Sequence, residues 1–191
     1  TLKHITHRAS ITYVKQHCPV LTFSDAGKHF CDARKTIQKL ASRTGGRQRT
    51  AERFCDAGAW SVGFHIEAVD DPMPVIELIR KKGVRTCLTI NPKTDIHSLD
   101  PYLGEVDMVL LMSVQAGYGG QGFIPESLDR LRYLRKQIDE LGLKTLIEVD
   151  GGVNAKWAPE LWEAGADILV AGSAVFNAKD PIAMVNLLKE G

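Results

Sequence analysis

Short apolar segments alternate with amphipathic segments along most of the chain, from about residue 54 onward. The apolar segments are rich in Val, Ile and Leu and are bounded by polar residues or glycine. Segments that are apolar at successive positions are typical of strands buried on both faces, as in a parallel sheet. We therefore predict strands at residues 61–65, 85–90, 108–114, 146–149 and 168–171.

The amphipathic segments between these strands have the spacing of helices with one buried face. A segment at 74–82 ends at Gly83, and a stronger one at 126–141 ends at Gly142. Glycine is the residue that most often follows the last turn of a helix. Asp180 followed by Pro181 is typical of an N-cap and a first-turn proline, which predicts a last helix after Asp180.

Alternating strands and helices indicate right-handed βαβ units and a parallel sheet, either as a barrel or as an open doubly wound sheet. No G-x-G-x-x-G follows a strand, so a dinucleotide-binding sheet lacks its fingerprint. Residues 56–59 and 163–167 repeat one Ala-Gly-Ala turn just before a predicted strand, which favours the barrel. The 191 residues are few for an eight-stranded α/β barrel, which usually needs about 250.

Residues 1–53 have a different pattern and hold four of the six histidines. Their only candidate strands are 11–14 and 19–23, and 32–40 is a candidate helix. We predict one barrel domain over 1–191, with a divergent N-terminal part at 1–53 that is incomplete or irregular.

The composition of the chain limits the classes of binding partner that we expect. The chain is 44% hydrophobic and 25% charged, with a formal net charge of +1, so its overall charge does not favour nucleic acid or an anionic membrane. Thr1–Ser10 has no signal-peptide character and no segment is long enough to span a bilayer, so we expect a soluble cytoplasmic protein. The four cysteines form no C-x-x-C pair, and Cys87 fits a small core residue.

Glycine-rich segments follow three successive predicted strands. Glycine allows the backbone to approach a ligand and to direct several N–H groups at it. A single cluster would indicate only a tight turn, but three in a row after the last strands of a barrel favour a phosphate site. The three segments are 114–121, 148–152 and 170–174.

Two other positions carry titratable side chains at strand ends. Asp150 follows a predicted strand and precedes two glycines, so it could act as a general acid or base, bind a metal, or cap the next helix. Asn154 is the better placed of the two to cap that helix. His65 ends its strand with Glu67 close behind, which fits either a pocket-lining histidine or a hydrogen-bonded core histidine.

These motifs, in this order and at this spacing, resemble the ribulose-phosphate 3-epimerase family over residues 52–191. The segments that carry the resemblance are Phe64-His65-Ile66-Glu67-Ala68, Ile90-Asn91-Pro92-Lys93-Thr94, Met112-Ser113-Val114 with Gly117-Tyr118-Gly119-Gly120-Gln121, Glu148-Val149-Asp150-Gly151-Gly152-Val153 and Ala171-Gly172-Ser173-Ala174-Val175-Phe176.

The resemblance implies a (β/α)₈ barrel and an isomerase of the pentose phosphate pathway. Such an enzyme interconverts D-ribulose 5-phosphate and D-xylulose 5-phosphate by proton transfer at C3 through a metal-stabilised enediolate. By motif, Asp150 is one catalytic acid and a ligand of a divalent metal, which would be zinc or, as alternatives, iron, manganese or cobalt. The phosphate-binding residues would be Gly117, Gly119, Gly120, Gly151, Gly152, Gly172 and Ser173.

The N-terminal part departs from the family pattern, because the chain contains neither a His-x-Asp nor a His-Leu-Met motif. Two alternatives therefore stay open beside the epimerase: a catalytically inactive phosphosugar-binding barrel, and a 3-epimerase for a hexulose 6-phosphate such as allulose 6-phosphate. A phosphate-binding barrel of tryptophan or histidine biosynthesis is a weaker third. The expected partner is a small-molecule sugar phosphate, with homo-oligomer formation undecided and neither nucleic acid nor membrane expected.

Overall fold

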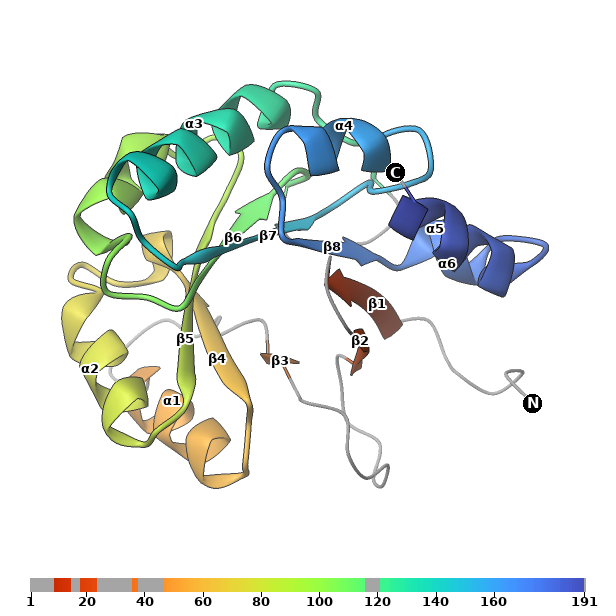
Figure 1. The fold of residues 1–191 in the computed structure, drawn as a ribbon. Helices are drawn as coiled ribbons and strands as arrows, with labels where there is room; N and C mark the ends of the chain where they lie inside the picture. Colours follow the sequence, from red (N-terminus) through yellow and green to blue (C-terminus); the bar gives the residue numbers. More distant parts are fainter. Residues whose placement is uncertain (1–8, 15–17, 24–35, 38–46, 116–120, 191) are drawn as a thin grey trace.

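A curved sheet with helices on its outer side forms the body of the molecule (Figure 1). The computed structural model describes residues 9–14, 18–23, 36–37, 47–115 and 121–190. Within these ranges the strands make one eight-stranded sheet in the order β2-β1-β8-β7-β6-β5-β4-β3. The strands β3 to β8 are parallel and follow the chain order, as the strand–helix alternation predicted.

Five parallel strands coincide with the predicted apolar segments, and their helices pack outside them. The strands are β4 (Ser61–His65), β5 (Arg85–Ile90), β6 (Met108–Met112), β7 (Leu146–Asp150) and β8 (Ile168–Ala171). The helices are α1 (Arg47–Asp56), α2 (Met73–Lys81), α3 (Ser127–Glu140), α4 (Ala158–Glu163), α5 (Ser173–Phe176) and α6 (Pro181–Glu190).

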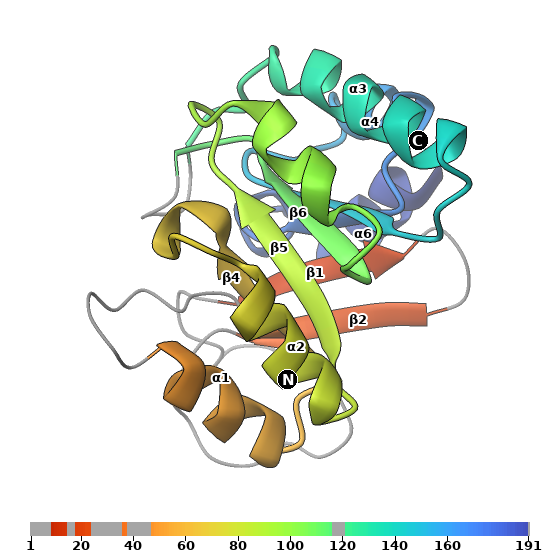
Figure 2. The same ribbon diagram turned by 90° about the vertical axis from the view of Figure 1, so that its left-hand side faces the viewer.

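The N-terminal strands depart from a regular barrel. β1 (Ala9–Val14) pairs antiparallel with β8, and β2 (Cys18–Phe23) pairs antiparallel with β1. Figure 2 shows these two strands side by side. The predicted irregularity of the N-terminal part is therefore confirmed, and both of its candidate strands form.

The prediction of a helix at residues 32–40 is wrong at its centre. Thr36–Ile37 forms a short strand, β3, parallel to Ser61 and Val62 at the start of β4. The helical spacing in this segment is overridden by the edge of β4, which offers backbone hydrogen-bonding groups to a passing chain. Helix α1, which follows, was not predicted.

The strands β4 to β8 are buried on two faces, which explains their apolar character. One face packs against the helices in a large core that includes Val62, Leu88 and Leu111. The other face points into the barrel, where Cys87, Met108, Leu110, Met112, Val114 and Ile168 form a separate cluster. Cys87 is a buried free thiol, as its apolar surroundings predicted.

Glycine ends the helices where the sequence indicates, with left-handed φ at Gly58, Gly83, Gly142 and Gly165. The repeated Ala-Gly-Ala turn is therefore a helix-to-strand connection in both places. The carboxylate of Asp180 accepts hydrogen bonds from the N–H groups of Ile182 and Ala183, which confirms the N-cap of α6. Among the described residues, no helix has the length and apolar character needed to cross a bilayer.

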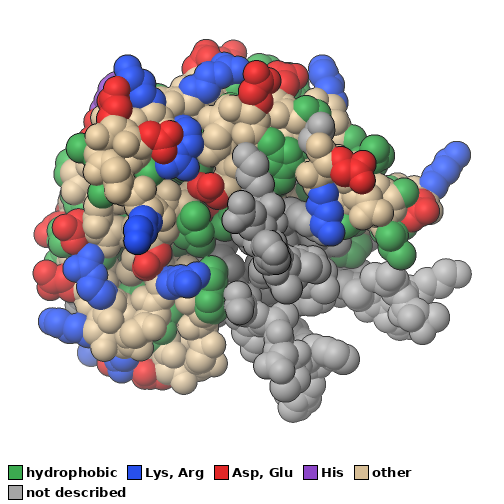
Figure 3. Space-filling model, in the orientation of Figure 1, with side chains coloured by type: hydrophobic (Ala, Val, Ile, Leu, Met, Phe, Trp, Pro, Cys, Tyr) green, Lys and Arg blue, Asp and Glu red, His purple; other side chains and the backbone are tan. Residues whose placement is uncertain are grey.

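The outer surface carries both signs of charge. On the face shown in Figure 3, acidic and basic side chains are interspersed over the helices at the left and top of the view. Ion pairs such as Arg80–Glu105 and Arg135–Asp139 contribute to this mixture. No single-sign field of the kind that attracts a polyanion covers this face.

The core under α3 gives the first prediction. Leu134→Ala removes a fully buried side chain, so we expect unfolding free energy to fall by about 2–5 kcal/mol in a denaturant titration. Leu141→Ala at the end of the same helix is the matched control, because Leu141 is 61% exposed and should change stability little. Equal losses for both variants would contradict the packing of α3 against the sheet.

Candidate functional site

Asp150 is the last residue of β7 and lies at the carboxyl end of the parallel strands. In register it stands between Met112 of β6 and Val170 of β8. Alternation along β7 places Asp150 on the same face as Glu148, which is the face directed into the barrel. Asp150 is only partly buried, so its carboxylate lies where the barrel interior meets its rim.

The turn after Asp150 requires glycine at two successive positions. Gly151 has φ +127° and Gly152 has φ +64°, and both values are unfavourable for residues with a side chain. A Cβ on Gly151 would lie 2.5 Å from Cγ2 of Val114, and one on Gly152 would lie 2.3 Å from the backbone N of Phe123. The backbone of this turn is therefore packed tightly against the segment that follows β6.

Ser113 ties these two strand ends together. Its hydroxyl donates a 2.6 Å hydrogen bond to the carbonyl of Gly151, and its N–H donates to the carbonyl of Asp150 at 2.9 Å. Ser113 is fully buried, so the hydroxyl has no access to water and the bond fixes the turn. Sequence reasoning gave Ser113 no role, although a serine next to five apolar strand residues was a signal.

The third glycine segment lies one strand further on. Gly172 follows β8, and Ser173 begins the short helix α5 as an exposed residue. Since β7 and β8 are adjacent, Gly151, Gly152, Gly172 and Ser173 all lie at the same end of the sheet. The predicted phosphate-binding residues Gly117, Gly119 and Gly120 are outside the described residues.

The contacts of Asn154 bear on whether Asp150 caps the next helix. The side-chain oxygen of Asn154 accepts from the N–H groups of Lys156 at 2.9 Å and Trp157 at 3.4 Å, just before α4. Asn154 therefore caps the turn that leads into α4, as predicted. The side-chain cap of this turn is Asn154 and not Asp150.

Glu148 lies below Asp150 inside the barrel and is 1% exposed. Burial in this apolar layer, together with the negative charge of Asp150, raises the pKa of Glu148 to about 8. Glu148 is therefore protonated at neutral pH and adds no second negative charge beneath Asp150. The sequence showed this glutamate within a strand but did not indicate its burial.

A hydrogen-bonded network surrounds His65 at the end of β4. Nδ1 of His65 lies 3.4 Å from Oε2 of Glu67 and 3.3 Å from Nδ2 of Asn91. Glu67 also accepts from the Asn91 N–H at 2.8 Å and from the Thr94 hydroxyl. β4 ends at His65 and a 3₁₀ helix at Ile66–Ala68 follows, so a tight turn, not a continued strand, brings Glu67 back to the ring.

These bonds determine the charge of Glu67. Partial burial raises its pKa, but the hydrogen bonds from His65, Thr94 and the Asn91 N–H outweigh this and lower the pKa to about 2. Arg130 of α3 holds the same loop from its other side, because its guanidinium donates to the carbonyls of Thr94 at 2.7 Å and Asn91 at 3.1 Å. The Asn91–Thr94 loop is therefore fixed between two charged side chains.

Asp150 is the one residue that the sequence analysis predicted as a metal ligand. In the part of the chain that is described, no group of three or more His, Cys, Asp or Glu side chains could hold a metal ion. Asp150 is a suitable oxygen donor by chemistry, but these residues by themselves do not make a complete metal site.

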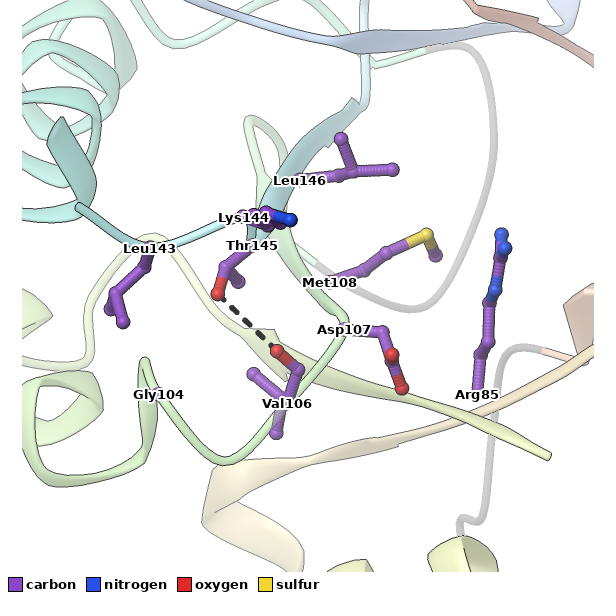
Figure 4. A pocket seen from close by; sticks show the side chains of 9 residues that line it. All are labelled: Arg85, Gly104, Val106, Asp107, Met108, Leu143, Lys144, Thr145 and Leu146. Atoms are coloured by element: carbon purple, nitrogen blue, oxygen red, sulfur yellow. Dashed lines mark hydrogen bonds between the residues drawn. The ribbon is translucent and has the colours of Figure 1, made fainter. Parts of the chain in front are cut away.

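A cavity of about 320 Å³ lies at the opposite end of the strands (Figure 4). Its polar groups are engaged with the protein. Arg85 stacks over the ring of Trp60 at 4.2 Å, Asp107 accepts from the N–H of Thr86, and the Thr145 hydroxyl donates to the Leu103 carbonyl. In α/β barrels this amino-terminal end serves stability, whereas catalysis occupies the carboxyl end.

The glycine turn yields a stability prediction. Gly152→Ala should lower unfolding free energy by at least about 1 kcal/mol, because alanine is strained at φ +64° and its Cβ would meet the backbone of Phe123. Denaturant unfolding measures this loss. Gly122→Ala is the control, since a Cβ there meets nothing within 4 Å. An unchanged Gly152→Ala variant would show that this turn is not packed as described.

Glu67 yields a pH prediction. Its folded pKa of about 2 lies below the ordinary 4.5, so its stabilising effect is complete above about pH 4.5 and is lost as pH falls towards 2. Thermal melting points of wild type and Glu67→Gln should therefore differ most above about pH 4.5 and converge as pH falls to about 2. Glu77→Gln, at an exposed position on α2, is the control. A pH-independent difference would contradict an ionised Glu67.

Known structures similar to this chain are α/β barrels. A 3-hexulose-6-phosphate synthase structure matches with a TM-score of 0.61 at 20% identity, over 83% of this chain and 73% of that one. The tryptophan synthase alpha-subunit from Pyrococcus furiosus matches with a TM-score of 0.53 at 21% identity, over 75% and 57%. At such identities the likeness shows the fold alone, which is that of the (β/α)₈ barrels.

Sequence comparison is more specific. The ribulose-phosphate 3 epimerase family model matches residues 45–176. The ribulose-phosphate 3-epimerase of Mycobacterium leprae is 43% identical over 74% of this chain and 63% of its own length. That of Escherichia coli K12 is 44% identical over 69% of this chain and 59% of its own. The chain thus spans about three fifths of these relatives, and it belongs to the ribulose-phosphate 3-epimerase family.

Proposed function

We propose that this protein is a sugar-phosphate 3-epimerase that interconverts D-ribulose 5-phosphate and D-xylulose 5-phosphate. The observation that carries the proposal is the Asp150-Gly151-Gly152 turn, which lies within the family match and at the carboxyl end of β7. The relatives from M. leprae and E. coli described above are ribulose-phosphate 3-epimerases. Active sites of α/β barrels are built at this end of the strands.

Asp150 is the proposed acid–base residue. The C3 proton of the substrate is acidified by the neighbouring C2 carbonyl, so a carboxylate can remove it and leave an enediolate. Return of a proton to the opposite face inverts C3, and this second transfer requires another acid across the sugar. The proposal assigns only the first role, to Asp150. Positioned acid–base groups contribute about 10²–10⁴-fold to rates.

The phosphate is proposed to bind at the glycine segments after β6, β7 and β8. Gly151 and Gly152 have no side chain to cover their N–H groups, and Gly172 and Ser173 lie one strand away at the same end. Gly117, Gly119 and Gly120 complete the proposed set. Backbone N–H groups of this kind bind anions without a charged side chain, which agrees with a chain whose net charge is only +1.

A divalent metal, zinc first and iron, manganese or cobalt as alternatives, is proposed with Asp150 as one ligand. When bound, such an ion would offset the negative charge that develops on the substrate oxygens. The described residues do not supply a full donor set, so the role proposed for Asp150 is limited to proton transfer and ligation.

The missing His-x-Asp motif favours a second candidate, a phosphosugar-binding barrel without catalysis. Deuterium exchange separates the two. The full chain is incubated with D-ribulose 5-phosphate in D₂O with added zinc, and C3 deuterium is followed by NMR. The epimerase predicts exchange above background. Binding of ribulose 5-phosphate without exchange would reject the epimerase in favour of the phosphosugar-binding barrel without catalysis. Exchange only with allulose 6-phosphate would assign the hexulose substrate.

Asp150→Asn tests the assignment of the acid. We expect C3 exchange to fall by at least about 10²-fold, because the amide cannot take up the proton, while inorganic phosphate binding stays unchanged. Asp129→Asn on the exposed side of α3 is the matched control and should keep full exchange. Full activity in Asp150→Asn would reject this role for Asp150.

A further inference from the structure

We propose that His65 is a substrate-orienting residue of the same site. In this proposal Glu67 holds the ring by Nδ1, so that Nε2 forms a hydrogen bond with a hydroxyl of the sugar chain. The inference rests on the proposed function for the identity of the sugar, but not for the geometry of the ring. Five observations on described residues carry it.

The first observation is the direction of the strand. Val62 and Phe64 belong to the core between the sheet and the helices. Alternation therefore directs the intervening Gly63 and the following His65 to the barrel interior. A Cβ on Gly63 would lie 3.3 Å from Cβ of Cys87, a member of the interior cluster, which agrees with this direction.

The second observation is the row in which His65 stands. His65 pairs with Thr89, Thr89 with Leu110, and Leu110 with Glu148. This row crosses the barrel interior one step below Asp150, which follows Glu148 by two residues on the same face. The side chain of His65 remains 17% exposed, so the ring lies at the boundary between the buried interior and the rim.

The third observation is the hold on one ring nitrogen. Nδ1 faces the Glu67 carboxylate at 3.4 Å and the Asn91 amide at 3.3 Å. A carboxylate accepts and an amide NH₂ donates, so one of these two groups can bond Nδ1 in either tautomer of the ring. Contacts that hold Nδ1 fix the direction of the ring and leave Nε2 to act on a ligand.

The fourth observation concerns the other ring nitrogen. No described residue forms a hydrogen bond with Nε2, although every contact of Nδ1 is with the β4 and β5 loops. Nε2 is on the far side of the ring from Nδ1 and therefore faces away from Glu67. A ring nitrogen can accept from a hydroxyl or donate to one, so Nε2 suits a sugar hydroxyl.

The fifth observation is rigidity. Glu67 binds the Asn91–Thr94 loop from the β4 side, and Arg130 binds the carbonyls of Thr94 and Asn91 from the α3 side. Elements from three successive βα units thus hold the ring. Groups fixed in this way bind a ligand without losing side-chain freedom, which is a requirement of an orienting residue.

The distance across the sheet fits a phosphosugar. β4 lies two strands beyond β6, so about 10 Å along the sheet separates the carboxyl ends of β4 and β6. With the phosphate held after β6 to β8 and C3 at Asp150, the proposal directs the end of the sugar remote from the phosphate towards β4. We therefore assign Nε2 of His65 to a hydroxyl at that end.

The competing explanation is a purely structural role, in which His65 only holds Glu67 in position. Two substitutions separate the roles. In His65→Asn the amide takes the place of Nδ1 and keeps the contact with Glu67, but nothing replaces Nε2. In His65→Gln the amide reaches the place of Nε2. Steady-state kinetics with ribulose 5-phosphate, inorganic phosphate binding and thermal melting are measured for both variants.

We expect His65→Asn to lower kcat/KM about tenfold, the effect of one lost hydrogen bond, with melting and phosphate binding unchanged. His65→Gln should retain more activity than His65→Asn. Wild-type kinetics in His65→Asn would overturn the inference. A loss of activity that follows a loss of thermal stability in both variants would also overturn it, in favour of the purely structural role.

Failure of the proposed function is distinguishable from failure of this inference. If the wild type shows no exchange, calorimetric affinities for ribulose 5-phosphate and inorganic phosphate replace the kinetics. The inference then predicts that His65→Asn weakens binding of the sugar phosphate about tenfold and leaves inorganic phosphate unaffected. Equal affinities of wild type and variant for the sugar phosphate would overturn it even in a protein without catalysis.

Discussion

Burial of the parallel strands on both faces is the constraint on which the rest of this structure depends. A strand covered by helices outside and by other strands inside has no solvated face, so an inward polar group must be paired, protonated or located at the rim. Glu148, the deepest of the inward acids, is kept neutral by burial, which raises its pKa. His65 is paired with Glu67, and Asp150 lies at the end of its strand.

The same constraint explains why chemistry is concentrated at the carboxyl end. Parallel strands bring all their carboxyl ends to one edge, where the backbone leaves the sheet and its N–H groups are no longer used in pairing. At β7 this exit is made by Gly151 and Gly152, which pack so closely on the segment after β6 that no side chain fits. The backbone of this turn is then held rigidly, a property that an anion site made of backbone N–H groups requires.

Rigidity on the β4 and β5 side has a different origin. There the loops are held by charge-assisted hydrogen bonds, with Glu67 and Arg130 on opposite sides of the Asn91–Thr94 loop. Steric fit of glycine at β7 and ionic bonding at β4 and β5 thus fix two parts of one rim. The proposed phosphate site would use the first kind of rigidity and the proposed sugar contact of His65 the second.

The sequence by itself determined the strands β4, β5 and β8 to the residue, the helices α2 and α3 to within one residue at each end, and the family. Local apolar runs, caps and glycines are short-range signals, which explains this success. The sequence did not determine β3 or the antiparallel pairing of β1, because edge pairing depends on which strand is nearby in space. Nor did it show that Ser113 bonds Gly151 or that Arg130 reaches Asn91, contacts between residues 38 and 39 positions apart. Only the tertiary structure decides such contacts, since they exist once separate βα units have packed side by side.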